Sequence, residues 1–112
     1  MTQMENLVYL MEIQYKNTQQ ELQSVVTQKI AICSKLDALK RHALSARNLN
    51  YEAEPEMRSM GADVVWERWL EKSRLQLNIE LSQTLARKES HLSLVRKSFG
   101  RLQVARQKNS TF

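Results

Sequence analysis

The sequence is poor in residues that interrupt helices and in residues that fill a large core. Its 112 residues include one proline and two glycines, and only 6% of them are aromatic. So few turn-forming residues favour long helices over a sheet protein. So little aromatic bulk argues against a large globular core. At this length the chain is predicted to form at most one domain.

The sequence also has a single cysteine, Cys33. An intramolecular disulfide needs two thiols, so none can form, and this suits a reducing cytoplasm. The first residues lack the basic-then-apolar order of a signal peptide. No apolar run approaches the ~20 residues that span a bilayer as a helix. We therefore predict a cytoplasmic protein.

No motif for catalysis, for a metal or for a cofactor is present. The sequence has neither a glycine-rich phosphate loop nor the Cys/His spacing of a metal site. His42 and His91 are isolated, and each is predicted to lie in solvent or at the edge of a helix seam. Cys33 is predicted to be a small, buried hydrophobic residue. We predict no enzyme activity, no cofactor and no small-molecule substrate.

An apolar heptad repeat runs through residues 2–50. Residues that recur every seven positions, in two rows offset by four, fall on one face of a supercoiled helix. The predicted seam comprises Met4, Val8, Met11, Tyr15, Thr18, Leu22, Val25, Lys29, Ile32, Leu36, Leu39, Ala43 and Ala46. Eleven of these thirteen residues are apolar, if Tyr15 is counted. This pattern predicts one long helix that packs against another.

Residues 51–60 interrupt the repeat, and Pro55 disfavours helical geometry at the residue before it. We predict a loop here, a second helix over 61–107 and a disordered tail over 108–112. Between Ser73 and Leu85 the apolar residues recur every four positions, which predicts a stutter that locally unwinds the supercoil. The predicted structural anchors are Trp66, Trp69, Leu77, Leu81, Leu85, Leu92 and Phe99.

The two helical patterns have similar lengths on either side of the loop. We therefore predict an all-α fold, a long antiparallel two-helix coiled-coil hairpin that spans residues 1–112 as one domain. Facing residue numbers should add up to about 110, which places Phe99 opposite Met11 and Val8. The alternative architecture is a dimer in which the helices pair between two chains.

Trp66 and Trp69 have two interpretations. The hairpin places them opposite the small residues Ala43 and Ala46, where they would lock the loop end. Alternatively, they form an exposed aromatic pair that a partner protein binds as a hot spot. Because they are three residues apart, both lie on one face of the helix.

The net charge is +5, and most of it lies in the second helix. The cluster that we predict as a partner-binding basic tip comprises Arg87, Lys88, Arg96, Lys97, Arg101 and Arg106, and Lys108 adjoins it. The alternative is a solvated helix end. Nucleic-acid binding is disfavoured, because such surfaces interleave aromatic with basic residues and only Phe99 is present here.

Four segments of the second helix resemble a known family. They are Gly61–Trp69 (Gly-Ala-Asp-Val-Val-Trp-Glu-Arg-Trp), Leu77–Leu81, Leu85–Glu89 and Arg96–Gly100. Together they are similar to the second helix of small FliJ-like proteins of flagellar protein export in alphaproteobacteria. The resemblance implies a two-helix antiparallel coiled coil, similar to the stalk helices of rotary ATP synthases. The tip formed by the two chain ends would enter the pore of the hexameric export ATPase.

The same resemblance implies contacts with the membrane export gate and with escort chaperones, at the cytoplasmic face of the inner membrane. The leading hypothesis is therefore a non-enzymatic stalk and adaptor of the flagellar export apparatus. A second hypothesis is a general coiled-coil or secretion-chaperone module that binds amphipathic helices. A third is a basic helical nucleic-acid binder, whose binding would depend strongly on salt.

Overall fold

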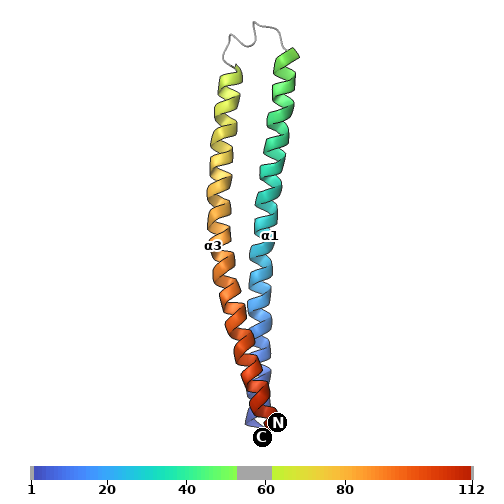
Figure 1. Ribbon diagram of the computed structural model, residues 1–112, viewed down its shortest axis with the longest axis vertical. Helices are drawn as coiled ribbons and strands as arrows, with labels where there is room; N and C mark the ends of the chain where they lie inside the picture. Colours follow the sequence, from blue (N-terminus) through green and yellow to red (C-terminus); the bar gives the residue numbers. More distant parts are fainter. Residues whose placement is uncertain (1, 53–61, 112) are drawn as a thin grey trace. The chain divides into compact units, whose positions relative to one another are not determined.

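The computed structural model describes residues 2–52 and 62–111, and it describes side chains over 2–45 and 64–111. Two helices make up this part of the chain, α1 (Gln3–Glu52) and α3 (Ala62–Thr111), as Figure 1 shows. The described ranges contain no strand. The predicted all-α, antiparallel two-helix fold is thus confirmed. Most of the predicted loop, with Pro55, lies outside the described residues.

A reciprocal pair of hydrogen bonds fixes the start of α1. The Glu5 backbone N–H donates to Thr2 Oγ1 at 3.2 Å, and the Thr2 N–H donates to Glu5 Oε2 at 3.2 Å. This capping box satisfies backbone donors that the first helical turn leaves without partners. The Asn6 N–H donates to the Thr2 carbonyl at 3.1 Å and begins the helical pattern.

At its other end, α3 extends further than the sequence predicted. The segment over 108–112 was expected to be a disordered tail, but it is helical as far as Thr111. The Ser110 hydroxyl donates to the Gln107 carbonyl at 2.9 Å within this last turn. Lys108 lies in the same turn, where its positive charge interacts favourably with the negative end of the helix dipole.

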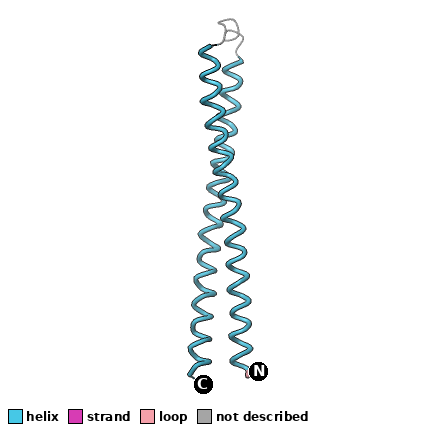
Figure 2. Tube along the Cα trace, turned by 90° about the vertical axis from the view of Figure 1, so that its right-hand side faces the viewer, coloured by secondary structure: helices cyan, strands magenta, loops and turns pink. Residues whose placement is uncertain are grey.

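The helices form two compact units. We call Met1–Gln28 with Thr84–Phe112 the terminal unit, and Lys29–Gln83 the central unit. Within each unit a segment of α1 lies alongside an antiparallel segment of α3, as two perpendicular views show (Figures 1 and 2). Both ends of the chain belong to the terminal unit.

The most deeply buried side chains belong to the terminal unit. Among the described side chains, those that are buried are Val25, Thr84, Ser98, Leu102 and Ala105. Thr84 is 1% exposed and Leu102 is 2% exposed. In the described part of the central unit the seam residues are at most half-buried. The tightest packing therefore lies in the terminal unit, from Thr84 at its inner boundary to Ala105 near the end of α3.

The seam of α1 coincides with the predicted heptad repeat. Each predicted seam residue from Met4 to Ala43 is buried or half-buried, whereas Ala46 lies outside the described side chains. This agreement includes Lys29, whose aliphatic stem can lie along apolar neighbours while its ammonium group stays near solvent. The apolar repeat alone was sufficient to place this face.

The seam of α3 differs from the predicted one. Thr84 and Ser98 are buried, whereas the adjacent Leu85 and Phe99 are 39% and 45% exposed. From Leu77 onward the seam positions lie in two seven-residue rows, which are Leu77, Thr84, His91, Ser98 and Ala105, and Leu81, Lys88, Val95 and Leu102. Nearer the start of α3, Ser73 is half-buried, whereas Arg74, which would continue the second row, is exposed. The predicted four-residue steps from Ser73 through Leu77 to Leu81 are therefore present, and the seam departs from the prediction at Thr84, which is buried in place of Leu85.

Small hydroxyl residues can occupy this seam because their polar atoms are satisfied. The Ser98 hydroxyl donates to the Leu94 carbonyl at 2.8 Å, one turn earlier in α3. Thr84 Oγ1 accepts a hydrogen bond from Arg87 Nη2 at 3.2 Å. A buried polar group costs little when it is hydrogen-bonded in this way.

Cross-helix contacts within the terminal unit establish its register. The three pairs are Glu12–Arg106 at 3.3 Å, Tyr15–Phe99 with ring centroids 5.5 Å apart, and Glu21–His91 at 3.7 Å. Their residue numbers add up to between 112 and 118, rather than to the predicted value of about 110. Phe99 consequently lies against Tyr15, about one helical turn along α1 from the predicted Met11.

Candidate functional site

The terminal unit carries most of the net charge. It contains eight Lys/Arg and four Asp/Glu, which accounts for four of the five net positive charges of the chain. Seven of these eight cations come from α3, whereas the α1 segment contributes three glutamates and Lys16. The positive charge is therefore concentrated on the α3 side of this unit.

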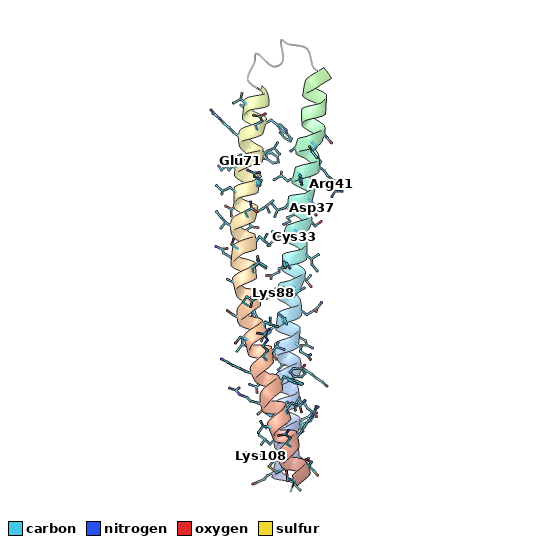
Figure 3. The ribbon with its side chains drawn as sticks, viewed as in Figure 1. Cys33, Asp37, Arg41, Glu71, Lys88 and Lys108 are labelled. Carbon is cyan, nitrogen blue, oxygen red and sulfur yellow. The ribbon has the colours of Figure 1, made fainter. Side chains whose placement is uncertain are left out.

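Four cations form what we call the basic flank of α3: Arg87, Lys97, Arg101 and Lys108. Arg87, Arg101 and Lys108 are separated by multiples of seven residues, and Lys97 precedes Arg101 by one helical turn. All four are exposed, and Lys108 lies near the end of α3 in Figure 3. Among the described residues, Lys97, Arg101 and Lys108 form no ion pair.

The other predicted basic residues lie elsewhere around α3. Lys88 is half-buried in the seam (Figure 3). Arg106 forms an ion pair with Glu12, which offsets its charge. Arg96 is exposed on the far side of α3 from the basic flank. The six residues predicted as one basic tip are therefore not brought together.

Helix geometry explains why the six predicted basic residues are separated. Successive residues of a helix point about 100° apart, so a cluster along the sequence spreads around the helix. Arg96 and Lys97 are adjacent in sequence, yet each belongs to a different flank of the α3 seam. The seven-residue spacing of Arg87, Arg101 and Lys108 was the signal that could have identified the basic flank.

The Glu12–Arg106 pair contributes little to stability, because both of its side chains are partly exposed. The Glu12 side chain is 39% exposed and that of Arg106 is 49% exposed. Surface pairs of this kind contribute about 0.2–1 kcal/mol. The contact between Glu21 Oε2 and His91 Nδ1, at 3.7 Å, is too long for a hydrogen bond and is attractive only when the imidazole is protonated.

Trp66 and Trp69 pack on each other. Their rings are stacked, with centroids 5.1 Å apart and an interplanar angle of 19°. They remain 37% and 52% exposed, and the neighbouring Val64 and Val65 are exposed as well. These exposures favour the interpretation of an exposed aromatic pair over that of anchors in a closed interface. Trp66 and Trp69 belong to the central unit, outside the unit that carries the basic flank.

The described side chains contain no arrangement of three or more His, Cys, Asp or Glu that could hold a metal ion. Cys33 is half-buried and is a free thiol. Neither α1 nor α3 has an apolar stretch sufficient to cross a bilayer. The surface chemistry of the described residues thus consists of charged flanks and exposed apolar side chains.

Comparisons with models of protein families, with curated proteins and with solved structures find no match for this chain. Its function must be inferred from its own residues, together with the resemblance described above. The features that bear on that inference are the antiparallel helices, the basic flank and the exposed apolar side chains.

Proposed function

We propose that this protein is a non-enzymatic stalk and adaptor of the flagellar protein export apparatus, which engages the hexameric export ATPase through its basic flank. The observation that carries the proposal is a row of exposed cations on the unit that contains both chain ends. The resemblance to FliJ-like proteins supplies the class of partner. It also supplies the export gate, the escort chaperones and a location peripheral to the inner membrane.

The mechanism requires shape and charge alone. From Arg87 to Lys108 the basic flank extends about 30 Å along α3, at 1.5 Å per residue. Lys97 and Arg101, four residues apart, are separated by roughly 6 Å along the axis, which is within the Debye length of about 8 Å at physiological salt. The fields of these two cations therefore add and attract an acidic surface, such as one lining an oligomeric pore.

The experiment is ATP hydrolysis by the purified export ATPase, with and without this protein. Wild-type protein should stimulate hydrolysis, and the double variant Lys97→Glu/Arg101→Glu should lose most of that stimulation. The matched control is Lys16→Glu/Arg96→Glu, which makes the same change in net charge on exposed residues outside the basic flank. The control should retain stimulation.

Two results would contradict the proposal at different levels. Full stimulation by Lys97→Glu/Arg101→Glu would show that the basic flank is not the contact. If the wild-type protein does not stimulate hydrolysis, the export ATPase is not its partner. The nucleic-acid alternative requires tight binding to RNA or DNA that weakens steeply with added salt, which the same protein preparations can test.

A further inference from the structure

The first turns of α1 expose large apolar side chains on the outside of the terminal unit. Leu7 and Ile13 are each 39% exposed, and Tyr9 and Leu10 are 56% and 58% exposed. At about 100° per residue, these four side chains spread over roughly 160° of the helix circumference. Of the residues in the segment over 7–13, only Glu12 is charged. This stretch of α1 is therefore apolar on its outer side as well as in the seam, which marks a surface that another phase or molecule covers.

The basic flank of α3 lies on the same side of the terminal unit as these apolar residues. The Glu12–Arg106 ion pair lies on one side of the two-helix seam. Leu7 lies on the opposite side of the α1 seam from Glu12, and Arg101 and Lys108 lie on the opposite side of the α3 seam from Arg106. The exposed apolar residues of α1 therefore border the basic flank.

The register places the two sets of residues at the same level along the helices. Cross-helix pairs in this unit have residue numbers that add up to between 112 and 118. Residues from Leu7 to Ile13 consequently lie alongside the segment over 99–111 of α3, which contains Arg101 and Lys108. We call the combined surface the amphipathic face, and it comprises Leu7, Leu10 and Ile13 of α1 with Arg101, Val104 and Lys108 of α3.

The amphipathic face contains no acidic side chain. The segment over 99–111 of α3 has none, and Glu5 and Glu12 lie on the other side of the α1 seam. Glu21 lies on the side of the amphipathic face, but more than two helical turns beyond Ile13. Among the described side chains, the charge that borders the apolar residues is therefore of one sign.

The shape of the amphipathic face fits a membrane surface better than a partner helix. A coiled-coil partner covers a narrow seam whose apolar residues repeat over about three heptads or more. The exposed apolar residues of α1 fall within a single heptad, and they form a convex arc that is wider than such a seam. Lipids rearrange around a convex surface, so that apolar side chains insert below the headgroups while Lys and Arg extend to the phosphates.

The charge of the amphipathic face fits an anionic membrane. A second copy of this chain would bring Arg101 and Lys108 against the same cations. An anionic lipid surface attracts them instead, and each Lys or Arg close to it strengthens binding about fivefold. The exposed Tyr9 suits the same environment, because tyrosine is enriched where the headgroups meet the hydrocarbon.

We propose that the amphipathic face binds the surface of an anionic phospholipid membrane. Leu7, Leu10 and Ile13 insert at the boundary between headgroups and acyl chains, and Arg101 and Lys108 pair with lipid phosphates. The inference goes beyond the proposed function. It shares the basic flank with the ATPase contact, but it adds apolar residues of α1 that this contact does not use.

The test is cosedimentation of the full chain with large unilamellar vesicles. One set of vesicles is phosphatidylcholine, and the other is an equal mixture of phosphatidylcholine and phosphatidylglycerol. Binding to the mixed vesicles should be about tenfold tighter or more, and it should weaken with added salt, because salt screens the attraction. Soluble glycerol phosphate at the same phosphate concentration should not displace the protein, because it provides the charge without an apolar layer.

Matched variants test the contribution of the apolar residues. Leu10→Gln/Ile13→Gln should weaken binding to the mixed vesicles about tenfold or more, because two inserted side chains are lost. The control is Leu75→Gln/Ile79→Gln, which changes the same residue types in the central unit, where they are 61% and 45% exposed. The control should change binding less than about twofold.

A second variant tests the charge of the amphipathic face. Arg101→Gln/Lys108→Gln should weaken binding to the mixed vesicles about 25-fold, at about fivefold for each cation, and should reduce its dependence on salt. Both substitutions are at exposed positions. This variant therefore decides the matter if circular dichroism shows that Leu10→Gln/Ile13→Gln has lost helicity.

Several outcomes would overturn the inference. They are equal binding to neutral and mixed vesicles, an equal loss of binding in the central-unit control, and unchanged binding of the charge variant. A wild-type dimer that Leu10→Gln/Ile13→Gln converts to monomer in sedimentation would identify a second copy as the occupant. The proposed function can fail separately, because Leu10→Gln/Ile13→Gln should still stimulate the export ATPase. Vesicle binding should likewise persist even if the wild-type protein does not stimulate hydrolysis.

Discussion

Two leucines in the terminal unit provide a test of the α3 seam. Leu102 is 2% exposed and lies in the seam, whereas Leu94 is 45% exposed and lies on the flank. Both are in the interior of α3, so Leu→Ala removes the same atoms in the same secondary structure. The difference in unfolding free energy between the two variants therefore reports tertiary burial, because the change in helix propensity is the same in both.

The burial of each leucine sets the expected loss in the free energy of unfolding. Leu→Ala removes three methylene equivalents, worth about 2.4 kcal/mol at ~0.8 kcal/mol each when they are fully buried. A cavity adds to this loss, and measured Leu→Ala costs in cores are about 2–5 kcal/mol. We expect about 3 kcal/mol for Leu102→Ala, because a two-helix seam is open enough for water to limit the cavity term. Leu94→Ala should cost less than about 1 kcal/mol.

The assay is urea unfolding followed by far-ultraviolet circular dichroism, with the midpoints compared at unchanged slope. A difference of about 2 kcal/mol corresponds to roughly a 30-fold change in the unfolding equilibrium constant. If Leu94→Ala destabilises the protein as much as Leu102→Ala does, the seam described for α3 is wrong. The face of α3 that packs against α1 would then include Leu94.

Three further predictions concern the same unit. Thr84→Lys should lower the free energy of unfolding by about 2 kcal/mol, because it buries a charge. Leu85→Lys should lower it by less than about 1 kcal/mol, and the midpoints of urea unfolding of the two variants measure the difference. A double-mutant cycle with Glu12→Gln and Arg106→Gln should give a coupling of about 0.2–1 kcal/mol that falls with added salt. Gly100→Ala should raise the melting temperature, with a gain of up to about 1 kcal/mol, because a β-carbon there meets nothing within 4 Å.

Each of these predictions has a clear contrary result. A larger loss from Leu85→Lys than from Thr84→Lys would restore the seam predicted from the sequence. Zero coupling energy between Glu12 and Arg106 at low salt would contradict the register of α1 against α3 described for the terminal unit. Destabilisation by Gly100→Ala would show that the outer face of α3 is more crowded than its open surroundings indicate.

The sequence by itself was sufficient for the fold class and for the seam of α1. Apolar residues there recur in two rows without a competing row, so burying any other face would leave the apolar rows in water. The capping box at Thr2 and Glu5, which was not among the predictions from the sequence, also involves residues only three positions apart. These features are local, because they depend on one helix and its immediate neighbours in sequence.

Only the tertiary structure decided the seam of α3 and the division of its cations. Two rows compete on this helix, one through Leu85 and Phe99 and one through Thr84 and Ser98. Hydrophobicity favours the first row, but packing against α1 buries the second, whose small hydroxyl side chains hydrogen-bond to groups of α3 itself. Burial of a face is a property of two helices, and the sequence of one helix does not contain it. The same packing leaves Leu85 and Phe99 exposed and separates Arg96 from the basic flank.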